Sequence, residues 1–312
     1  MLRDLWRYIR ERFALPASLP LSAILWLAAP WHRAGAFSHI MAGCVGVFFA
    51  LLALRIADDI NSLEQDRLRK PERGLCSGAI SAAHLRTWVV CLLPCALVLQ
   101  AFALWPDNAA PASGLLQHSA PNALLITGTV LAYCAYFHYK KRLPLLLRPC
   151  CSNLLFLTLP LLGLSATSDA THWPDALWLG LFCWCSAIGH EFAHNVRAAN
   201  ESEAPDGQPL APDYVDLLGS RGVFWLALGL YLLASIAALA LVSRHSLHPV
   251  FGWSVALAVI GLAFLFARLW QQPGLARARA LYVPGFLFFL LPLLLDLLAA
   301  YLTPYLLRYL PL

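Results

Sequence analysis

Charged residues are scarce in this sequence. Only 12% of its 312 residues are Asp, Glu, Lys or Arg, and 60% are hydrophobic. Soluble domains carry about 25% charged residues, so this composition excludes a soluble globular protein and predicts a polytopic membrane protein. The net charge is +5. The basic residues are distributed along the chain as a membrane-topology signal is, and we therefore expect no nucleic-acid partner.

Cysteines at the spacing of a metal-binding or redox motif are also missing. The nine Cys residues lie in apolar segments and form no C-x-x-C pair, which argues against a zinc ribbon and a disulfide framework. The amino terminus lacks the long apolar core and the cleavage site of a signal peptide. Residues 1–14 are basic and amphipathic, and we expect this segment to lie on the membrane surface.

Apolar segments of about 20 residues, long enough to cross a bilayer, recur along the chain. Of the 22 Lys and Arg residues, 19 fall on one side of the resulting topology. Positive residues stay cytoplasmic, so we expect a cytoplasmic amino terminus and a carboxyl terminus on the opposite side. We predict one all-α membrane domain over residues 1–312, with nine spanning helices at 15–33, 37–57, 84–105, 121–139, 145–166, 174–194, 222–243, 249–270 and 280–302.

The charges that are present gather in the stretch RIADDINSLEQDRLRKPERGLCSGAIS, residues 55–81. Asp58 and Asp59 lie at the end of a predicted span, where acidic residues are costly and usually mark a site. Asp59 and Asp66 are seven residues apart, so on a helix they share a face about 10 Å apart along the axis. One Mg²⁺ ion cannot bind both, whereas two cations bridged by a phosphorylated ligand can.

Basic and aromatic side chains near this stretch are suited to an anionic ligand. Arg67 and Arg73 can form charge-assisted hydrogen bonds with phosphate oxygens. Tyr136 and Lys140 are four residues apart and share a helix face; Lys140 is a compact charge for phosphate, and tyrosine rings attract cations. Asn153 is polar and can face the same cavity. The alternative is that these residues are a solvated loop, an aromatic belt and topology signals.

The stretch 55–81 resembles the first aspartate-rich motif of the UbiA superfamily of intramembrane prenyltransferases, N-D-x-x-D-x-x-x-D followed by R-P. Asp58 takes the Asn position, Asp59 that of the first Asp and Asp66 that of the last. Ser62 stands in place of the middle Asp, and Gly74 replaces the Pro after the arginine. The resemblance implies Mg²⁺, two ions in all, bound to an isoprenyl diphosphate.

Two later segments also resemble the family. Tyr136 and Lys140 match its Y-x-x-x-K element, which implies a lysine on the diphosphate. Most members carry a second aspartate-rich motif, but the stretch GHEFAHNVRAANESE, residues 189–203, has no aspartate. It is similar instead to the variant E-x-A-R-K-I-R-A-P-E-E-E. The match implies that Glu191 binds the second Mg²⁺, that Asn195 or Glu201 assists, and that Arg197 contacts the substrate.

The same letters spell H-E-x-x-H at His190, Glu191 and His194, a zinc-binding pattern of membrane metalloproteases. A zinc protease therefore stays an alternative, as do two helix-end histidines without a metal. A terpene cyclase, which ionises the diphosphate without an acceptor, and a non-catalytic transporter or lipid-binding bundle are further alternatives.

The preferred interpretation is a bundle of nine spans around a central cavity that opens to the cytoplasmic side. Its expected function is Mg²⁺-dependent transfer of a prenyl group from an isoprenyl diphosphate to an aromatic or lipid acceptor. We expect the protein to lie among the lipids of a membrane, the bacterial inner membrane.

Overall fold

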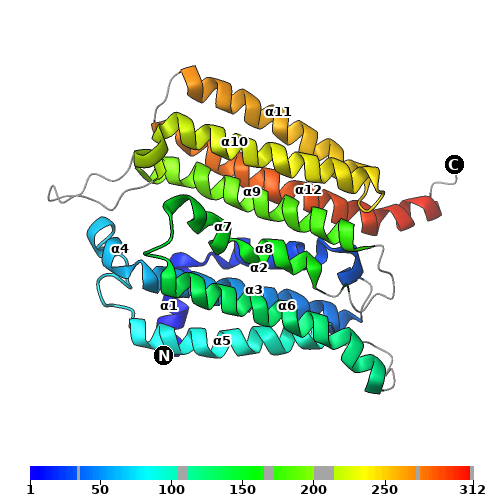
Figure 1. Ribbon diagram of the computed structural model, residues 1–312, viewed down its shortest axis with the longest axis horizontal. Coiled ribbons are helices and arrows are strands. Elements are labelled where there is room, and N and C mark those ends of the chain that lie inside the picture. The colour runs from blue at the N-terminus through cyan, green and yellow to red at the C-terminus, as the bar shows by residue number, and fades with distance from the viewer. Residues whose placement is uncertain are drawn as a thin grey trace. The chain divides into compact units, whose positions relative to one another are not determined.

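The computed structural model describes residues 1–33, 36–104, 112–162, 164, 172–199, 214–271 and 275–309. Every regular element in these ranges is a helix, which confirms the all-α prediction. The chain divides into two compact units. Figure 1 labels their α-helices. Among the described residues, the amino-terminal unit holds 1–26 and 33–140, and the carboxy-terminal unit holds 27–32, 141–199 and 214–309.

The amino-terminal unit is built around α3, which packs against α5. Helices α4 and α6 contact α3, and α1 contacts α5. The indole of Trp26 lies against α3 at Gly43, where any Cβ would overlap the ring, so only glycine permits this approach. The elements are α1 (Leu2–Arg12), α2 (Leu15–Leu27), α3 (Phe37–Asn61), α4 (Leu63–Arg69), α5 (Ala82–Ala103) and α6 (Ala112–Tyr139).

Helix α1 is part of the core of this unit. Its residues Leu5, Tyr8 and Ile9 recur at helical spacing and are buried in a cluster with Leu52 and Ile56 of α3. This face of α1 is therefore covered by protein, while Leu2 and Trp6 of the same helix are more than half exposed. The position of residues 1–14 on the membrane surface stays a prediction.

In the carboxy-terminal unit, α9 packs against α10 and α12, and α11 packs against the same two helices. Helix α10 is kinked at Gly219, whose φ of 66° lies in the left-handed region that favours glycine. The elements are η1 (Pro30–Arg33), η2 (Leu145–Leu147), α7 (Arg148–Ser152), α8 (Leu154–Thr158), η3 (Leu159–Leu161), α9 (Trp173–Ala199), α10 (Tyr214–Ser243), α11 (Pro249–Gln271) and α12 (Leu275–Tyr309).

Six helical segments among the described residues are long and apolar enough to cross a membrane, and they coincide with six of the predicted spans. They are Phe37–Asn61, Ala82–Ala103, Trp173–Ala193, Arg221–Ser243, Pro249–Arg268 and Val283–Thr303. Of the other three predictions, 121–139 lies within α6, and 15–33 is represented by α2, which has only 13 residues. The total of nine spans stays a prediction.

The predicted span 145–166 is wrong as one continuous helix, because the chain there forms the short elements η2, α7, α8 and η3. Pro149 lies at the start of α7 and Pro160 in η3, and proline lacks the N–H that a continuous helix needs. Asn153 joins α7 to α8 with φ −101° and ψ 13°, outside helical geometry. The interruption brings polar side chains into an otherwise apolar segment.

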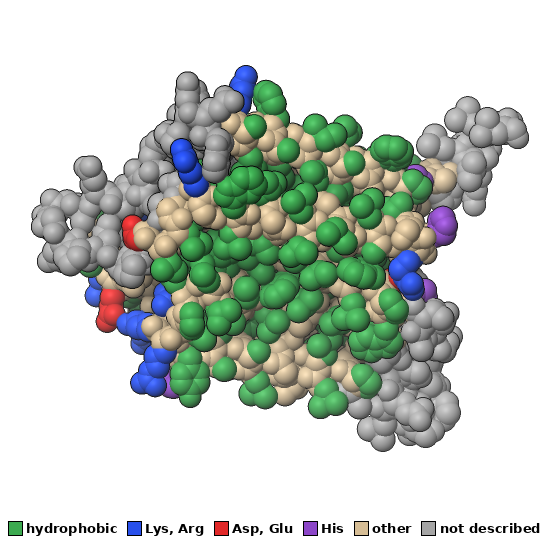
Figure 2. Space-filling view, turned by 45° about the horizontal axis from the view of Figure 1, so that its top comes forward, with side chains coloured by type: hydrophobic (Ala, Val, Ile, Leu, Met, Phe, Trp, Pro, Cys, Tyr) green, Lys and Arg blue, Asp and Glu red, His purple; other side chains and the backbone are tan. Residues whose placement is uncertain are grey.

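The sides of the spanning helices expose large hydrophobic side chains (Figure 2). Trp225 and Leu239 on α10, and Trp253 and Leu257 on α11, are all more than half exposed. Exposed apolar area of this kind is expected where the surrounding solvent is lipid, in agreement with a multi-pass membrane protein.

Candidate functional site

The three acidic residues of the first polar stretch differ in exposure. Asp58 and Asp59 lie in the last turn of α3, and Asp66 lies in α4. Their side chains are 37%, 7% and 22% exposed, respectively. Adjacent residues on a helix point about 100° apart, so Asp58 is accessible to a ligand while its neighbour Asp59 is buried.

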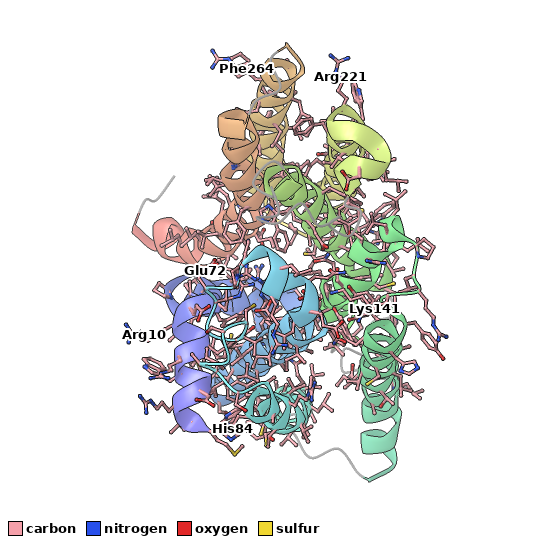
Figure 3. The ribbon with its side chains drawn as sticks, turned by 90° about the vertical axis from the view of Figure 1, so that its left-hand side faces the viewer. Arg10, Glu72, His84, Lys141, Arg221 and Phe264 are labelled. Carbon is pink, nitrogen blue, oxygen red and sulfur yellow. The ribbon has the colours of Figure 1, made fainter. Side chains whose placement is uncertain are left out.

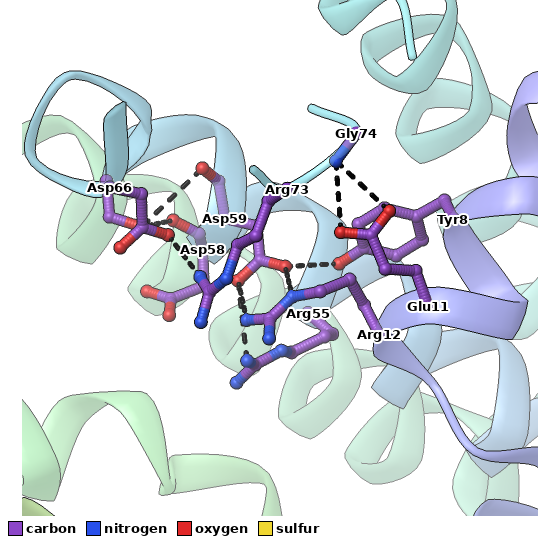
Figure 4. A network of polar contacts seen from close by, with 10 residues as sticks. Tyr8, Glu11, Arg12, Arg55, Asp58, Asp59, Asp66, Arg73 and Gly74 are labelled. Atoms are coloured by element: carbon purple, nitrogen blue, oxygen red, sulfur yellow. Dashed lines mark hydrogen bonds and ion pairs between the residues drawn. The ribbon is translucent and has the colours of Figure 1, made fainter. Parts of the chain in front are cut away.

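Both carboxylate oxygens of Asp59 accept hydrogen bonds (Figure 4). Tyr8 donates its phenol to Oδ2 at 2.9 Å, and Arg12 donates Nε to Oδ2 at 2.9 Å and Nη2 to Oδ1 at 3.0 Å. Arg55, one turn earlier on α3, reaches Oδ1 at 3.4 Å. Burial raises the pKa of Tyr8, and the Asp59 charge raises it further, so the phenol keeps its proton and acts as a donor.

The polar loop after α4 is also attached to α1. The backbone N–H of Gly74 donates to both carboxylate oxygens of Glu11 at 3.1 Å. At the end of the loop, Ser81 Oγ accepts the N–H of His84 and caps α5, while His84 Nδ1 lies 2.7 Å from Asp4 Oδ2. This hydrogen bond is the largest of the causes that lower the pKa of Asp4.

A small pocket lies between α1 and this loop. Asp66 lines it and accepts a hydrogen bond from Arg73 Nη1 at 2.8 Å. The predicted phosphate ligand Arg73 thus lies beside the acidic residues, whereas Arg67 is exposed. The full lining is Tyr8, Glu11, Arg12, Asp59, Asp66, Arg73, Leu75, Cys76 and Ile80.

Lys140 also contacts an acidic residue of the first polar stretch. Its ammonium group, just after α6, forms an ion pair with Asp58 Oδ1. The Lys140 Nζ atom also lies 5.9 Å from the centre of the Tyr136 ring, within the range of a cation–π contact. The structure therefore brings the Y-x-x-x-K element to the first aspartate-rich stretch.

In the carboxy-terminal unit, Glu191 is held by the interrupted segment. Its Oε2 accepts a hydrogen bond from Asn153 Nδ2 at 2.6 Å and one from Ser152 Oγ at 3.1 Å. Trp184 Nε1 donates to the carbonyl of Cys150 at 3.0 Å, which secures α7 against α9. The helix break is thus the local reason why two polar side chains reach one carboxylate.

Part of the second polar stretch cannot be placed. Glu201 lies outside the described residues, and for His194, Asn195 and Arg197 only the helical backbone is described. His190, the other histidine of the H-E-x-x-H pattern, lies 5.7 Å from Phe286 measured between ring centres. Among the residues that can be described, no three His, Cys, Asp or Glu side chains are grouped to hold a metal ion.

Asp58 and Asp66 fit a magnesium site, because Mg²⁺ usually binds one or two carboxylates and completes its shell with substrate phosphates and water. Both side chains are partly exposed and lie beside cationic groups that can hold the phosphates. Asp59 does not fit as a ligand in this arrangement, because its buried oxygens already accept hydrogen bonds from Arg12 and Tyr8.

Sequence reasoning missed several partners in these clusters. Tyr8 and Arg12 are four residues apart on an amphipathic helix, and that spacing is the one signal that could have shown them on a common face. No pattern in the sequence around Ser152 indicated that it would contact Glu191. Asp296, an acid inside α12, accepts the N–H of His248 at 2.7 Å immediately before α11, so the structure gives it a helix-capping role.

The sequence matches the model of the UbiA prenyltransferase family over residues 17–293. In fold, the chain is similar to a digeranylgeranylglyceryl phosphate synthase of 19% identity, with a TM-score of 0.64 over 95% of this chain and 98% of that one. It is also similar to the apo structure of a UbiA homologue from Aeropyrum pernix K1 of 16% identity, with a TM-score of 0.66 over 92% and 98% of the two chains. No curated protein matches the sequence.

Proposed function

Because the chain belongs to the UbiA prenyltransferase family, we propose that it ionises an isoprenyl diphosphate and transfers the prenyl group to an aromatic or lipid acceptor. The observation that carries this proposal is that two partly exposed carboxylates of the first polar stretch are each paired with a cationic group, Asp58 with Lys140 and Asp66 with Arg73. One structural neighbour is a digeranylgeranylglyceryl phosphate synthase, which keeps a lipid acceptor in the proposal.

In this proposal each residue has a defined task. Asp58 and Asp66 hold Mg²⁺, two ions in all, and Glu191 supplies a ligand from the second polar stretch, assisted by Asn195 or Glu201. When bound, the ions neutralise charge that develops on the leaving diphosphate. Lys140 and Arg73 bind the departing oxygens, Arg67 and Arg197 assist them, and Tyr136 presents its ring to the prenyl cation.

The bond between the prenyl C1 atom and the diphosphate oxygen breaks, and its electron pair leaves with the diphosphate. The acceptor then donates an electron pair to C1 and loses a proton. An apolar cavity that excludes water protects the prenyl cation from hydrolysis. We place this cavity in a bundle of nine spans, open toward the cytoplasm, in one domain over residues 1–312 of a bacterial inner-membrane protein.

The test is diphosphate release by purified full-length protein, with isoprenyl diphosphates of several chain lengths, with and without Mg²⁺, and with and without aromatic and lipid acceptors. Release that requires both Mg²⁺ and an acceptor supports the proposal. No release from any substrate, by protein that elutes as one folded species, contradicts it.

A terpene cyclase is the second candidate, because the second polar stretch lacks the aspartates of ordinary members and carries Glu191 instead. Release of diphosphate without an acceptor, with a cyclic hydrocarbon as product, would favour the cyclase over the transferase.

A further inference from the structure

We propose that Arg12 of α1 binds an oxygen of the diphosphate, and that Asp59 positions the Arg12 guanidinium instead of binding a cation. This inference rests on the proposed function, because it concerns the ligand of the same site. It adds a binding residue from outside both polar stretches and gives Asp59 a different task from the one that the motif implies.

The first observation is the number of donors that Arg12 has left. A guanidinium group carries five N–H donors, and Asp59 takes one from Nε and one from Nη2. No other hydrogen bond of this side chain is formed with the described residues, so three donors are available. The side chain is 18% exposed and lines the pocket beside Asp66 and Arg73.

The second observation is that two arginines line that pocket and that each is held by a carboxylate. Arg12 is held by Asp59, and Arg73 is held by Asp66 through Nη1 at 2.8 Å (Figure 4). Two bonds to Asp59 fix the plane of the Arg12 guanidinium, one bond to Asp66 holds Arg73, and both arginines keep further N–H groups for a ligand. Planar N–H pairs match the geometry of phosphate oxygens, so two fixed arginines from different elements favour a phosphoryl group as the ligand.

The third observation is how firmly Asp59 is held. Its side chain is 7% exposed, Arg12 and Tyr8 bind both of its oxygens, and Arg55 lies at 3.4 Å. A cation could bind Asp59 only after at least two of these contacts had broken, and breaking a buried ion pair is strongly unfavourable. Asp58 is the more accessible ligand, because 37% of its side chain is exposed.

The experiment titrates full-length protein in nanodiscs of zwitterionic lipid with inorganic pyrophosphate and Mg²⁺, by calorimetry. Arg12→Gln should weaken pyrophosphate binding about 10- to 100-fold, as expected for loss of a hydrogen bond between charged groups. Arg12→Lys should give an intermediate loss. Arg10→Gln is the matched control, because Arg10 lies on the same helix but is exposed and points away from the unit (Figure 3); it should bind as the wild type does.

A second measurement separates positioning from metal binding. Manganese bound at saturating pyrophosphate, counted by electron paramagnetic resonance, should be the same in Asp59→Asn as in the wild type and lower in Asp58→Asn. Loss of manganese in Asp59→Asn overturns the assignment. So does an Arg12→Gln protein that binds the cation more tightly and pyrophosphate unchanged, since Arg12 would then be blocking a metal site.

A third measurement uses the wild-type protein and so does not depend on how the variants fold. Cys76 lines the same pocket, and pyrophosphate with Mg²⁺ should slow its alkylation, as measured by mass spectrometry. An unchanged rate contradicts the inference. Wild-type protein that binds no pyrophosphate overturns the proposed function itself, whereas binding that does not depend on Arg12 overturns only this assignment.

Discussion

At the scale of the residue, the neighbours Lys140 and Lys141 have different surroundings. Lys140 forms an ion pair with Asp58 and lies near the Tyr136 ring, whereas Lys141 is exposed. Lys140→Gln should lower kcat/KM for diphosphate release about 10- to 100-fold, since the departing oxygens lose a charge-assisted bond. Lys141→Gln is the control and should retain wild-type turnover. Equal losses in the two variants would mean that only the overall charge of this end of α6 matters.

The acidic residues show what a sequence motif can predict about a site and what it cannot. The motif assigns Asp58, Asp59 and Asp66 by letter, and Asp58 and Asp59 lie near the end of α3 as the sequence indicates. Asp66 lies on the separate helix α4, because the chain leaves helical geometry at Ser62, so Asp59 and Asp66 do not share one continuous helix as expected. The partners of Asp59 could not be predicted, because Arg12 and Tyr8 are 47 and 51 residues away in the sequence. A contact at that separation depends on how α1 packs against α3, and a sequence pattern does not contain this information.

At the scale of the element, the apolar character and length of the segments predicted the long apolar helices, and six of them are found at the expected positions. The same reasoning failed for 145–166, where composition is apolar but Pro149 and Pro160 interrupt the backbone hydrogen bonds. A hydropathy value depends on the side chains alone, so it gives no information about a backbone N–H that proline lacks. The break matters for the site, because it places Ser152 and Asn153 on Glu191.

The interrupted segment gives a prediction that isolates this contact. Asn153→Ala should reduce kcat/KM about 10-fold if it acts by orienting Glu191, because a hydrogen bond to a charged group contributes about 1.5–3 kcal/mol. The reduction should disappear in a Glu191→Gln background, since residues that act through one another are not additive. Enzyme assays on the four proteins of this cycle provide the measurement. Independent, multiplicative effects would show that Asn153 acts on the substrate directly.

At the scale of the whole molecule, the number of spans decides on which side of the membrane the termini lie. An odd number such as nine places them on opposite sides, whereas an even number places them on the same side. Because positive residues stay cytoplasmic, a reporter fused to the amino terminus should report the cytoplasm. Fusion to the carboxyl terminus should report the opposite side, as measured with reporters active in only one compartment. Both reporters on one side would contradict nine spans.

The attachment of α1 also sets an order of events during synthesis. Tyr8, Glu11 and Asp4 find their partners 51, 63 and 80 residues later in the chain. Helix α1 therefore lacks its last partner until the ribosome has made the start of α5, roughly 4–16 seconds later at about 5–20 residues per second. During that interval its apolar face is uncovered, and a lipid surface is where such a face is buried. We therefore expect the membrane surface to hold residues 1–14 of the nascent chain before α1 packs in the folded unit.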